Sequence, residues 1–261
     1  MNLDLSGKRA FVGGASRGLG LACAQALAAE GCLVAIASRS QINLDAAVES
    51  LPKNASVLPI VADLSTPEGI RTSFEQLDAW GPVDILVNNT GGPPPGRSFD
   101  HDEKVWQKAY ESLLLYAKRM CDHFIPGMRQ RKWGRVIAIT SYAVKEPIEH
   151  LVLSNVFRTG LTAYLKVLAK EVAADGVTVN SVLPGAYRTA RYEEILEATA
   201  KRTGKDKETV AQELIAKLPL KRFQRPEELG ALVAFLASPL SSAITGTAIP
   251  ADGGMLQALL S

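Results

Sequence analysis

The stretch Arg9-Ala10-Phe11-Val12-Gly13-Gly14-Ala15-Ser16-Arg17-Gly18-Leu19-Gly20 joins a short apolar run to a glycine-rich turn, and a helical pattern follows it over Leu19–Ala29. Glycines let a backbone approach a pyrophosphate closely, and the first turn of a helix supplies N–H donors and positive potential. The arrangement predicts a strand, a phosphate-binding turn and a helix, as in proteins that bind dinucleotides.

Apolar β-rich runs alternate with helical patterns along the rest of the chain. The expected strands are Arg9–Gly13, Leu33–Ala37, Ser56–Val61, Ile85–Asn88, Val136–Thr140, Thr178–Leu183 and Thr247–Pro250. Helical patterns between them include Pro67–Ala79 and Pro226–Ala237. Strands without strict polar alternation are typical of a parallel sheet covered on both faces. We therefore predict one α/β domain over residues 1–261, a Rossmann-type doubly wound parallel sheet of about seven strands.

The composition narrows the classes of function. The 261 residues include 29 basic and 27 acidic side chains, and a net charge of +2 gives no support for nucleic-acid binding. No apolar run is long enough to span a membrane, and the amino terminus resembles no secretory signal, so we expect a cytoplasmic protein. The three cysteines have no metal-type or Cys-x-x-Cys spacing and are expected to be buried thiols, and no metal site is expected.

Residues 187–225 interrupt the alternation, since they contain two helical pieces and no strand. The second piece begins near Asp206, a good helix cap, and places Val210, Leu214, Ile215 and Leu218 on one face. Ligands of such sheets bind beyond the carboxyl ends of the strands. We predict that this helical pair is a substrate lid; the alternative is a packing excursion without a binding role.

Several further motifs occur in a characteristic order. They are the spacing Gly14-x-x-x-Gly18-x-Gly20, Val61-Ala62-Asp63-Leu64, Asn88-Asn89-Thr90-Gly91, Pro184-Gly185 followed by Thr189, and Ala251-Asp252-Gly253-Gly254. In these motifs the chain resembles the short-chain dehydrogenase/reductase family, with Gly13 where that family usually has Thr. The resemblance implies that Asp63 contacts the adenine and that Pro184, Gly185 and Thr189 hold the nicotinamide amide. It also implies binding roles for Ser16, Leu19, Asn89 and Gly91, and a homodimer or homotetramer.

The end of the second expected strand indicates which dinucleotide binds. NAD-selective sites place a carboxylate here for the ribose 2′-hydroxyl. This chain has Ser38 and Arg39 instead, with Arg17 in the glycine-rich turn. Because guanidinium groups pair with phosphate through two parallel hydrogen bonds, we predict NADP(H) rather than NAD. The alternative is that both arginines are ordinary solvated surface residues.

The residues expected to perform the chemistry are altered. The family resemblance implies an Asn, a Ser, a Tyr and a Lys, the last two as Tyr-x-x-x-Lys. The Ser is present as Ser141, but Ser154 stands at the Tyr position and Arg158 at the Lys position. The Asn position falls on Ser112 or Leu113. A serine is a much weaker acid than a tyrosine, and an arginine cannot relay a proton as a lysine can.

Two functions remain open. The first is an NADP-dependent oxidoreductase resembling divergent 3-oxoacyl-carrier-protein reductases, acting on a small carbonyl, alcohol or acyl-thioester substrate. In it Ser141 and Ser154 would bind the carbonyl, Arg158 would hold the ribose, and Tyr187, His150 or a water would donate the proton. The second is a catalytically inactive NADP(H)-binding sensor or partner subunit. The cofactor-binding turn fits both.

Overall fold

The computed structural model describes residues 2–258 and contains one seven-stranded parallel sheet in the order β3-β2-β1-β4-β5-β6-β7. The strands are β1 (Arg9–Val12), β2 (Leu33–Ser38), β3 (Val57–Val61), β4 (Ile85–Asn88), β5 (Gly134–Ile139), β6 (Val177–Pro184) and β7 (Ala248–Ala251). This confirms the predicted fold class and each expected strand, with ends that differ by at most two residues.

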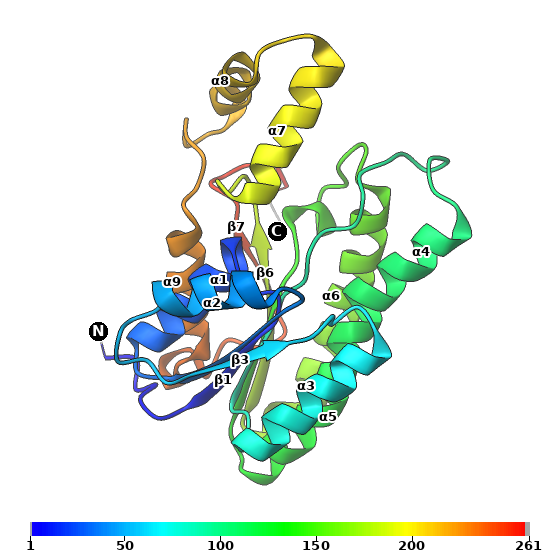
Figure 1. The fold of residues 1–261 in the computed structure, drawn as a ribbon. Coiled ribbons are helices and arrows are strands. Elements are labelled where there is room, and N and C mark those ends of the chain that lie inside the picture. Colours follow the sequence, from blue (N-terminus) through cyan, green and yellow to red (C-terminus); the bar gives the residue numbers. More distant parts are fainter. Residues whose placement is uncertain (1, 259–261) are drawn as a thin grey trace.

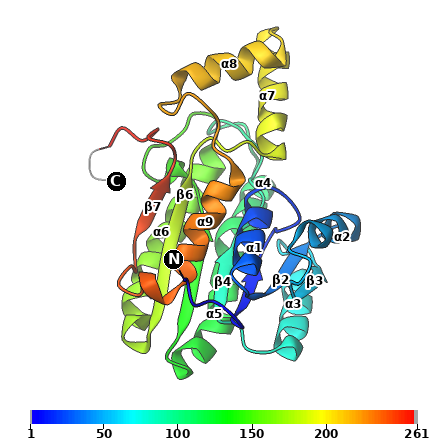
Figure 2. The ribbon, with the colours of Figure 1, turned by 90° about the vertical axis from the view of Figure 1, so that its left-hand side faces the viewer.

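Helices cover both faces of the sheet (Figures 1 and 2). One face packs against α1 (Gly18–Ala29), α2 (Gln41–Ser50) and α9 (Pro226–Ala237). The other packs against α3 (Pro67–Trp80), α5 (Tyr116–Gln130) and α6 (Val152–Val172). Each face has its own apolar core, which explains why the strands read as continuous apolar runs; all residues of β4, for example, are buried. The three cysteines are buried and unpaired, as predicted.

The helical pair predicted after β6 forms α7 (Ala190–Thr203) and α8 (Lys207–Lys217). Both helices stand beyond the sheet at the top of Figure 1, above the end of β6. Thr189 caps α7 and Asp206 caps α8, each by accepting a hydrogen bond from a backbone N–H. A small apolar cluster of their own, with Leu196 and Val210 buried, holds the two helices together. Their role as a lid remains a prediction.

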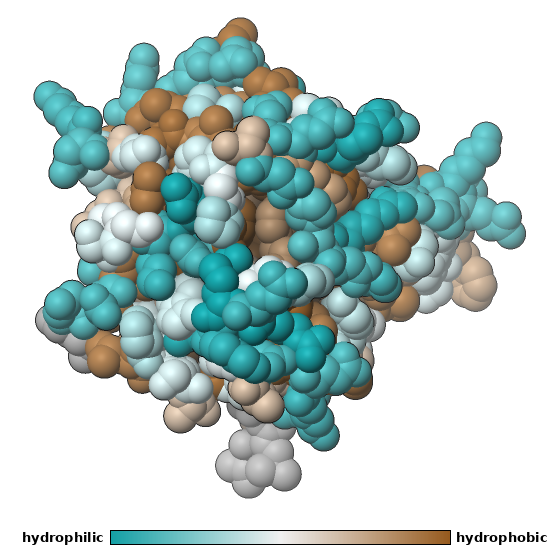
Figure 3. All heavy atoms as spheres, turned by 90° about the horizontal axis from the view of Figure 1, so that it is seen from below, coloured by the Kyte–Doolittle hydropathy of each residue, from teal (hydrophilic) through white to brown (hydrophobic). Residues whose placement is uncertain are grey.

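The opposite end of the molecule is shown in Figure 3 and is mainly hydrophilic, with hydrophobic residues in scattered patches. Within residues 2–258, no helix is long and apolar enough to cross a membrane. The described residues also contain no cluster of His, Cys, Asp and Glu side chains suited to a metal ion. Open α/β sheets bind their ligands beyond the carboxyl ends of the strands, so the functional site is expected there.

Candidate active site

A cavity of about 530 Å³ opens at the carboxyl ends of β1, β2, β3 and β4. The strand order reverses between β1 and β4, which is where open α/β sheets bind their ligands. Predicted cofactor residues that line the cavity are Gly14, Ser16, Arg17, Ser38, Arg39, Asp63, Asn89 and Gly91. The sheet therefore brings these residues, which lie far apart in the sequence, to a single hollow.

The glycine-rich turn is held from behind by Asn89. The Asn89 side-chain amide donates hydrogen bonds to the carbonyl oxygens of Gly13 and Gly14, at 3.0 and 3.2 Å. Gly14 has a φ of +57°, and a Cβ there would lie 3.0 Å from the Asn89 side chain. Gly20 packs its Cα directly against the Gly14 carbonyl. Side chains at Gly14 and Gly20 would therefore displace the turn that faces the cavity.

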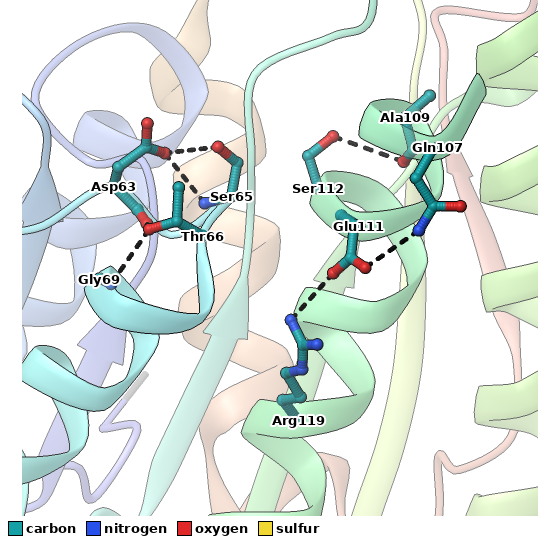
Figure 4. Close-up of polar contacts among 9 residues, drawn as sticks. All are labelled: Asp63, Ser65, Thr66, Gly69, Gln107, Ala109, Glu111, Ser112 and Arg119. Atoms are coloured by element: carbon teal, nitrogen blue, oxygen red, sulfur yellow. Dashed lines mark hydrogen bonds and ion pairs between the residues drawn. The ribbon is translucent and has the colours of Figure 1, made fainter. Parts of the chain in front are cut away.

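One wall of the cavity carries Asp63, drawn in Figure 4. Its carboxylate accepts hydrogen bonds from the hydroxyl and the backbone N–H of Ser65, at 2.6 and 3.0 Å. Burial alone raises the pKa of Asp63, but these hydrogen bonds and the charges of Arg39 and Lys108 outweigh it, so the pKa is lowered. Asp63 is therefore a fixed, ionised acceptor in the cavity wall.

The cavity has an excess of positive charge at its outer edge. Arg17, Arg39 and Lys108 line it, against the single carboxylate of Asp63. The hydroxyl of Ser38 donates to that of Ser16 at 2.9 Å, which joins the end of β2 to the glycine-rich turn. Arg17 also lies 4.0 Å from Glu194 of α7. These cations and hydroxyls suit a ligand that carries phosphate groups.

The remaining predicted cofactor residues lie outside the lining of this cavity. Gly18 faces Thr189, since a Cβ on Gly18 would lie 3.5 Å from the Thr189 methyl group. Gly185 follows the last residue of β6, Pro184, and packs against the backbone of Asp252. Leu19 lies on α1 and packs against the core. The structure thus places Thr189 and the glycine-rich turn side by side, although the sequence separates them widely.

Arg158, one of the residues predicted for catalysis, contacts the end of β5. Ser154 and Arg158 are one turn apart on α6 and both are buried, so they share the face that packs on the sheet. The Arg158 guanidinium donates a hydrogen bond to the carbonyl oxygen of Ile139, the last residue of β5, at 2.8 Å. Ser141 follows two residues later. The structure therefore brings Arg158 to the strand end that carries Ser141.

The hydrogen bonds leave the Ser141 proton available. The Ser141 oxygen accepts a hydrogen bond from the Ala143 backbone N–H at 3.1 Å. Within the described chain, the Ser141 hydroxyl donates to no residue. A hydroxyl has one proton to donate, so Ser141 can donate it to a ligand.

Arg158 is a buried cation without a carboxylate partner among residues 2–258. Burial lowers its pKa to about 10, which still leaves the guanidinium charged at neutral pH. Such an unpaired charge is costly inside a protein unless a ligand compensates it.

The helix expected to carry the missing Asn is distorted. Glu111–Leu115 form a π-helix between α4 (Glu103–Tyr110) and α5. Ser112 lies in this segment, lines the cavity and donates to the Ala109 carbonyl oxygen at 3.4 Å (Figure 4), while Leu113 is buried. A π-helix is rare and often marks a functional site, and no pattern in the sequence predicts it.

The structure argues against Tyr187 as a proton donor. Tyr187 is 3 % exposed and packs in the core between the sheet and α1 and α9. Burial, with Glu228 and Asp252 nearby, raises its pKa, whereas a catalytic tyrosine needs its pKa lowered by a cation. Burial also raises the pKa of Tyr142, the residue after Ser141. Neither phenol has the environment of an acid that works at neutral pH.

His150 belongs to the rim of the site. Its Nδ1 accepts a hydrogen bond from the Arg97 Nε at 3.2 Å, and its backbone carbonyl accepts one from the Gly96 N–H at 2.7 Å. His150 thus connects the loop after β4 with the loop before α6. The described contacts bring it neither to Ser141 nor to Ser154.

Comparisons with known proteins match almost the whole chain. A family model described as Enoyl-(Acyl carrier protein) reductase matches residues 14–256. The chain is 32% identical to 3-oxoacyl-[acyl-carrier-protein] reductase FabG of Vibrio cholerae, over 97% of this chain and 99% of the relative. It is 31% identical to NADPH-dependent reductase BacG of Bacillus subtilis, over 98% and 100%.

Solved structures agree with these matches. L-Sorbose reductase from Gluconobacter frateurii, complexed with NADPH and L-sorbose, superposes with a TM-score of 0.94 at 33% identity, over 99% of this chain and 100% of that one.

Sequence reasoning missed several residues of the cavity. They are Ala37, Ala62, Leu64, Ser65, Thr90, Gly92, Pro93, Pro94, Val105, Lys108 and Ala109. Lys108 comes from a helical segment without a motif, so only the fold could place it near Asp63. The Pro-rich loop after Gly91 gave a signal, since Gly92-Pro93-Pro94 directly continues a predicted cofactor motif.

Proposed function

The chain belongs to the short-chain dehydrogenase/reductase family, and we propose that it is an NADPH-dependent reductase of small-molecule carbonyl compounds with a non-standard active site. The observation that carries the proposal is the cavity of about 530 Å³ with three cations and the glycine-rich turn in its lining. 3-Oxoacyl thioesters are candidate substrates, because a FabG protein is among the relatives.

The cavity fits NADPH on its own geometry. Asp63 is a fixed acceptor in one wall for an N–H donor such as the adenine amino group. Arg17 and Arg39 suit the 2′-phosphate, and the N–H groups at the start of α1 suit the pyrophosphate. Bound there, NADPH supplies a hydride, and the protein must orient the substrate and stabilise negative charge on its oxygen.

In our proposal, three side chains orient the substrate and stabilise the negative charge on its oxygen. Ser141 donates its free hydroxyl proton as a hydrogen bond to the substrate oxygen. Ser154 lies on the same buried face as Arg158 and is a second hydroxyl for that oxygen. Arg158 contributes positive charge and N–H donors for a ribose hydroxyl. The final proton comes from water in this scheme, since no phenol near Ser141 has a lowered pKa.

A second candidate function is a non-catalytic NADP(H)-binding sensor or partner subunit. The observation in its favour is that Ser154 and Arg158 replace the Tyr and Lys of the family, whereas the predicted residues of the glycine-rich turn still line the cofactor cavity. The α6 helix exposes Val156 and Val167, and a second cavity of about 450 Å³ lies between α6, β6 and β7. We propose a homodimer or homotetramer for either function, and light scattering of the purified protein tests it.

Two measurements separate the candidates. Calorimetry measures the binding of NADPH, and absorbance of the nicotinamide measures its oxidation with acetoacetyl thioester and a panel of ketones. Binding with turnover supports the reductase, and binding without turnover on the whole panel supports the sensor. The double change Ser154→Tyr with Arg158→Lys is a second probe, because a phenol beside an ammonium group restores a general acid worth about 10² to 10⁴ in rate.

A further inference from the structure

A second cavity lies at the β7 edge of the sheet, between α6, β6 and β7 (Figure 2). Its volume is about 450 Å³, within the range of about 300 to 1,000 Å³ that is typical of small-molecule sites. The cofactor cavity and this second cavity share no lining residue among those described. The proposed function therefore gives the second cavity no part in binding NADPH.

The lining of the second cavity is positively charged. It contains Lys145, which directly follows η2 (Tyr142–Val144), and Lys166 of α6. Among the described residues, no Asp, Glu or His lines this cavity. Within residues 2–258, Lys145 has no hydrogen-bond or ion-pair partner, and the carboxylate of neighbouring Glu146 accepts a hydrogen bond from the Gln257 backbone N–H instead, at 3.3 Å. The two positive charges are therefore not neutralised by the protein.

The Lys166 ammonium is held in place at the edge of the cavity. It donates a hydrogen bond to the Gly246 carbonyl oxygen at 2.6 Å. Gly246 has a φ of +68°, and a Cβ on it would lie 3.4 Å from the Lys166 Cδ, so the lysine side chain lies across the glycine. An ammonium group has three N–H donors, so two remain for a ligand.

Hydroxyl groups of the cavity also lack partners. Ser181 of β6 is 2 % exposed and lines the cavity, and its hydroxyl makes no hydrogen bond in the part of the chain that the structure describes. The hydroxyls of Thr159 and Thr247 are likewise unpaired with any described residue. Thr162 donates to the Arg158 carbonyl oxygen at 2.8 Å. A buried hydroxyl without a partner is unfavourable, so a ligand that hydrogen-bonds to Ser181 would stabilise this wall.

We propose that this cavity is a second ligand site of the protein and that it binds a small organic acid. A carboxylate accepts hydrogen bonds from ammonium and hydroxyl groups, and its charge compensates those of Lys145 and Lys166. The apolar side chains of Val144, Leu165 and Val179 also line the cavity and suit a short apolar body attached to the carboxylate. The inference does not depend on the proposed function, because it requires no hydride transfer.

A binding experiment with a charged and an uncharged probe tests the site. The probes are 4-fluorobenzoate and 4-fluorobenzamide, which have nearly the same shape, and fluorine NMR follows their binding to the protein. NADP⁺ at saturating concentration keeps the anion out of the cofactor cavity. We expect saturable binding of the benzoate, and binding of the benzamide that is at least about fivefold weaker, since it lacks the charge that pairs with the lysines.

Variants assign the binding to this cavity. Lys145→Gln and Lys166→Gln should each weaken benzoate binding about fivefold, and the double change about 20-fold or more. Ser181→Ala should also weaken it, without lowering the stability of the ligand-free protein, because the hydroxyl has no protein partner to lose. Two matched controls should leave benzoate binding unchanged. They are Lys170→Gln, which removes an α6 charge outside the cavity, and Arg39→Ala, which removes a charge of the cofactor cavity.

The proposal is overturned by no saturable binding, by equal binding of the benzamide, or by full binding in the double lysine variant. Weakening by Arg39→Ala as large as that by the lysine changes would place the anion in the cofactor cavity, and this also overturns it. Binding that disappears as light scattering shows the protein to associate would mean that a second copy fills the cavity, which again overturns the ligand site. Since none of these measurements uses NADPH oxidation, a failure of the reductase function leaves the result readable.

Discussion

The hydroxyl of Tyr116 lies against Gly13, in the space that a Cβ on residue 13 would occupy. Tyr116 is 1 % exposed and its hydroxyl is buried without a hydrogen-bond partner. Gly13 stands where the family usually has Thr, so a tyrosine from α5 fills the place of a side chain beneath the cofactor-binding turn. This contact links the glycine-rich turn to the apolar core on the side of the sheet that α3, α5 and α6 cover. Changes at either residue should therefore alter the stability of the protein.

We expect Gly13→Ala to destabilise the protein, because the new methyl group would collide with the Tyr116 hydroxyl and the Asn89 carbonyl oxygen. Tyr116→Phe should raise the free energy of unfolding by about 1 kcal/mol or more, because it removes an unpaired buried hydroxyl. In the Tyr116→Phe background Gly13→Ala should cost less, with a coupling of about 0.5 kcal/mol or more in urea unfolding. Strictly additive effects would show that the two residues do not interact.

Arg39 should determine the preference for the phosphorylated cofactor. Since charge-assisted hydrogen bonds contribute about 1.5 to 3 kcal/mol, Arg39→Ala should weaken NADPH binding about 10- to 100-fold and leave NADH binding nearly unchanged. Calorimetry with both cofactors measures the two affinities, and Lys170→Ala controls for the loss of one positive charge. An equal loss of affinity for NADPH and NADH would mean that Arg39 does not bind the 2′-phosphate.

Arg158 should reduce stability at neutral pH, because its charge is buried without a carboxylate. Burial lowers its pKa to about 10 in the folded state, below the value in the unfolded chain. Above pH 10 the unfolded chain therefore binds more protons at this group, and stability from Arg158 rises with pH by up to about 1.4 kcal/mol per unit. The difference in unfolding free energy, wild type minus Arg158→Met, should therefore be lower at pH 7 than at pH 11. If this difference in unfolding free energy falls as the pH rises, Arg158 is not a buried charge that lacks a partner.

Asn155 should hold the rim of the site. Its side chain donates to the Ile148 carbonyl oxygen at 2.9 Å and accepts from the Ile148 N–H at 3.3 Å. Asn155→Ala removes both bonds, so backbone hydrogen exchange should accelerate at residues 146–151 and at Gly96, which pairs with Leu151. Exchange in β6 should stay the same. If exchange at these residues does not change, contacts other than those of Asn155 keep the rim ordered.

Local pattern was sufficient to predict the fold. Ile85–Asn88 was predicted residue for residue, because an apolar run bounded by turn residues fixes a buried strand. Pro226–Ala237 was also predicted to the residue from proline and two glutamates in its first turn. The family resemblance implies that Ser141, Ser154 and Arg158 share one site, which stays a prediction.

Contacts distant in sequence could not be predicted. Lys108 lies near Asp63 only because α4 lines the same cavity. Tyr187 follows the Pro184-Gly185 motif and was one of three candidate proton donors, with His150 and water, but its ring is buried in the core. No local sequence pattern predicts where a side chain points after the end of a strand. The positions of Lys108 and Tyr187 therefore depend on the tertiary packing.

We propose that this site transfers a hydride with a fixed cation in place of an ionisable phenol. The most direct measurement is the pH dependence of NADPH oxidation with acetoacetyl thioester at saturating cofactor. We predict a rate that is flat between about pH 6 and pH 9 and falls as the pH passes about 10, where Arg158 loses its charge. A rate that falls with rising pH through neutrality, and loses that dependence on mutation of a single tyrosine or of His150, would contradict the account.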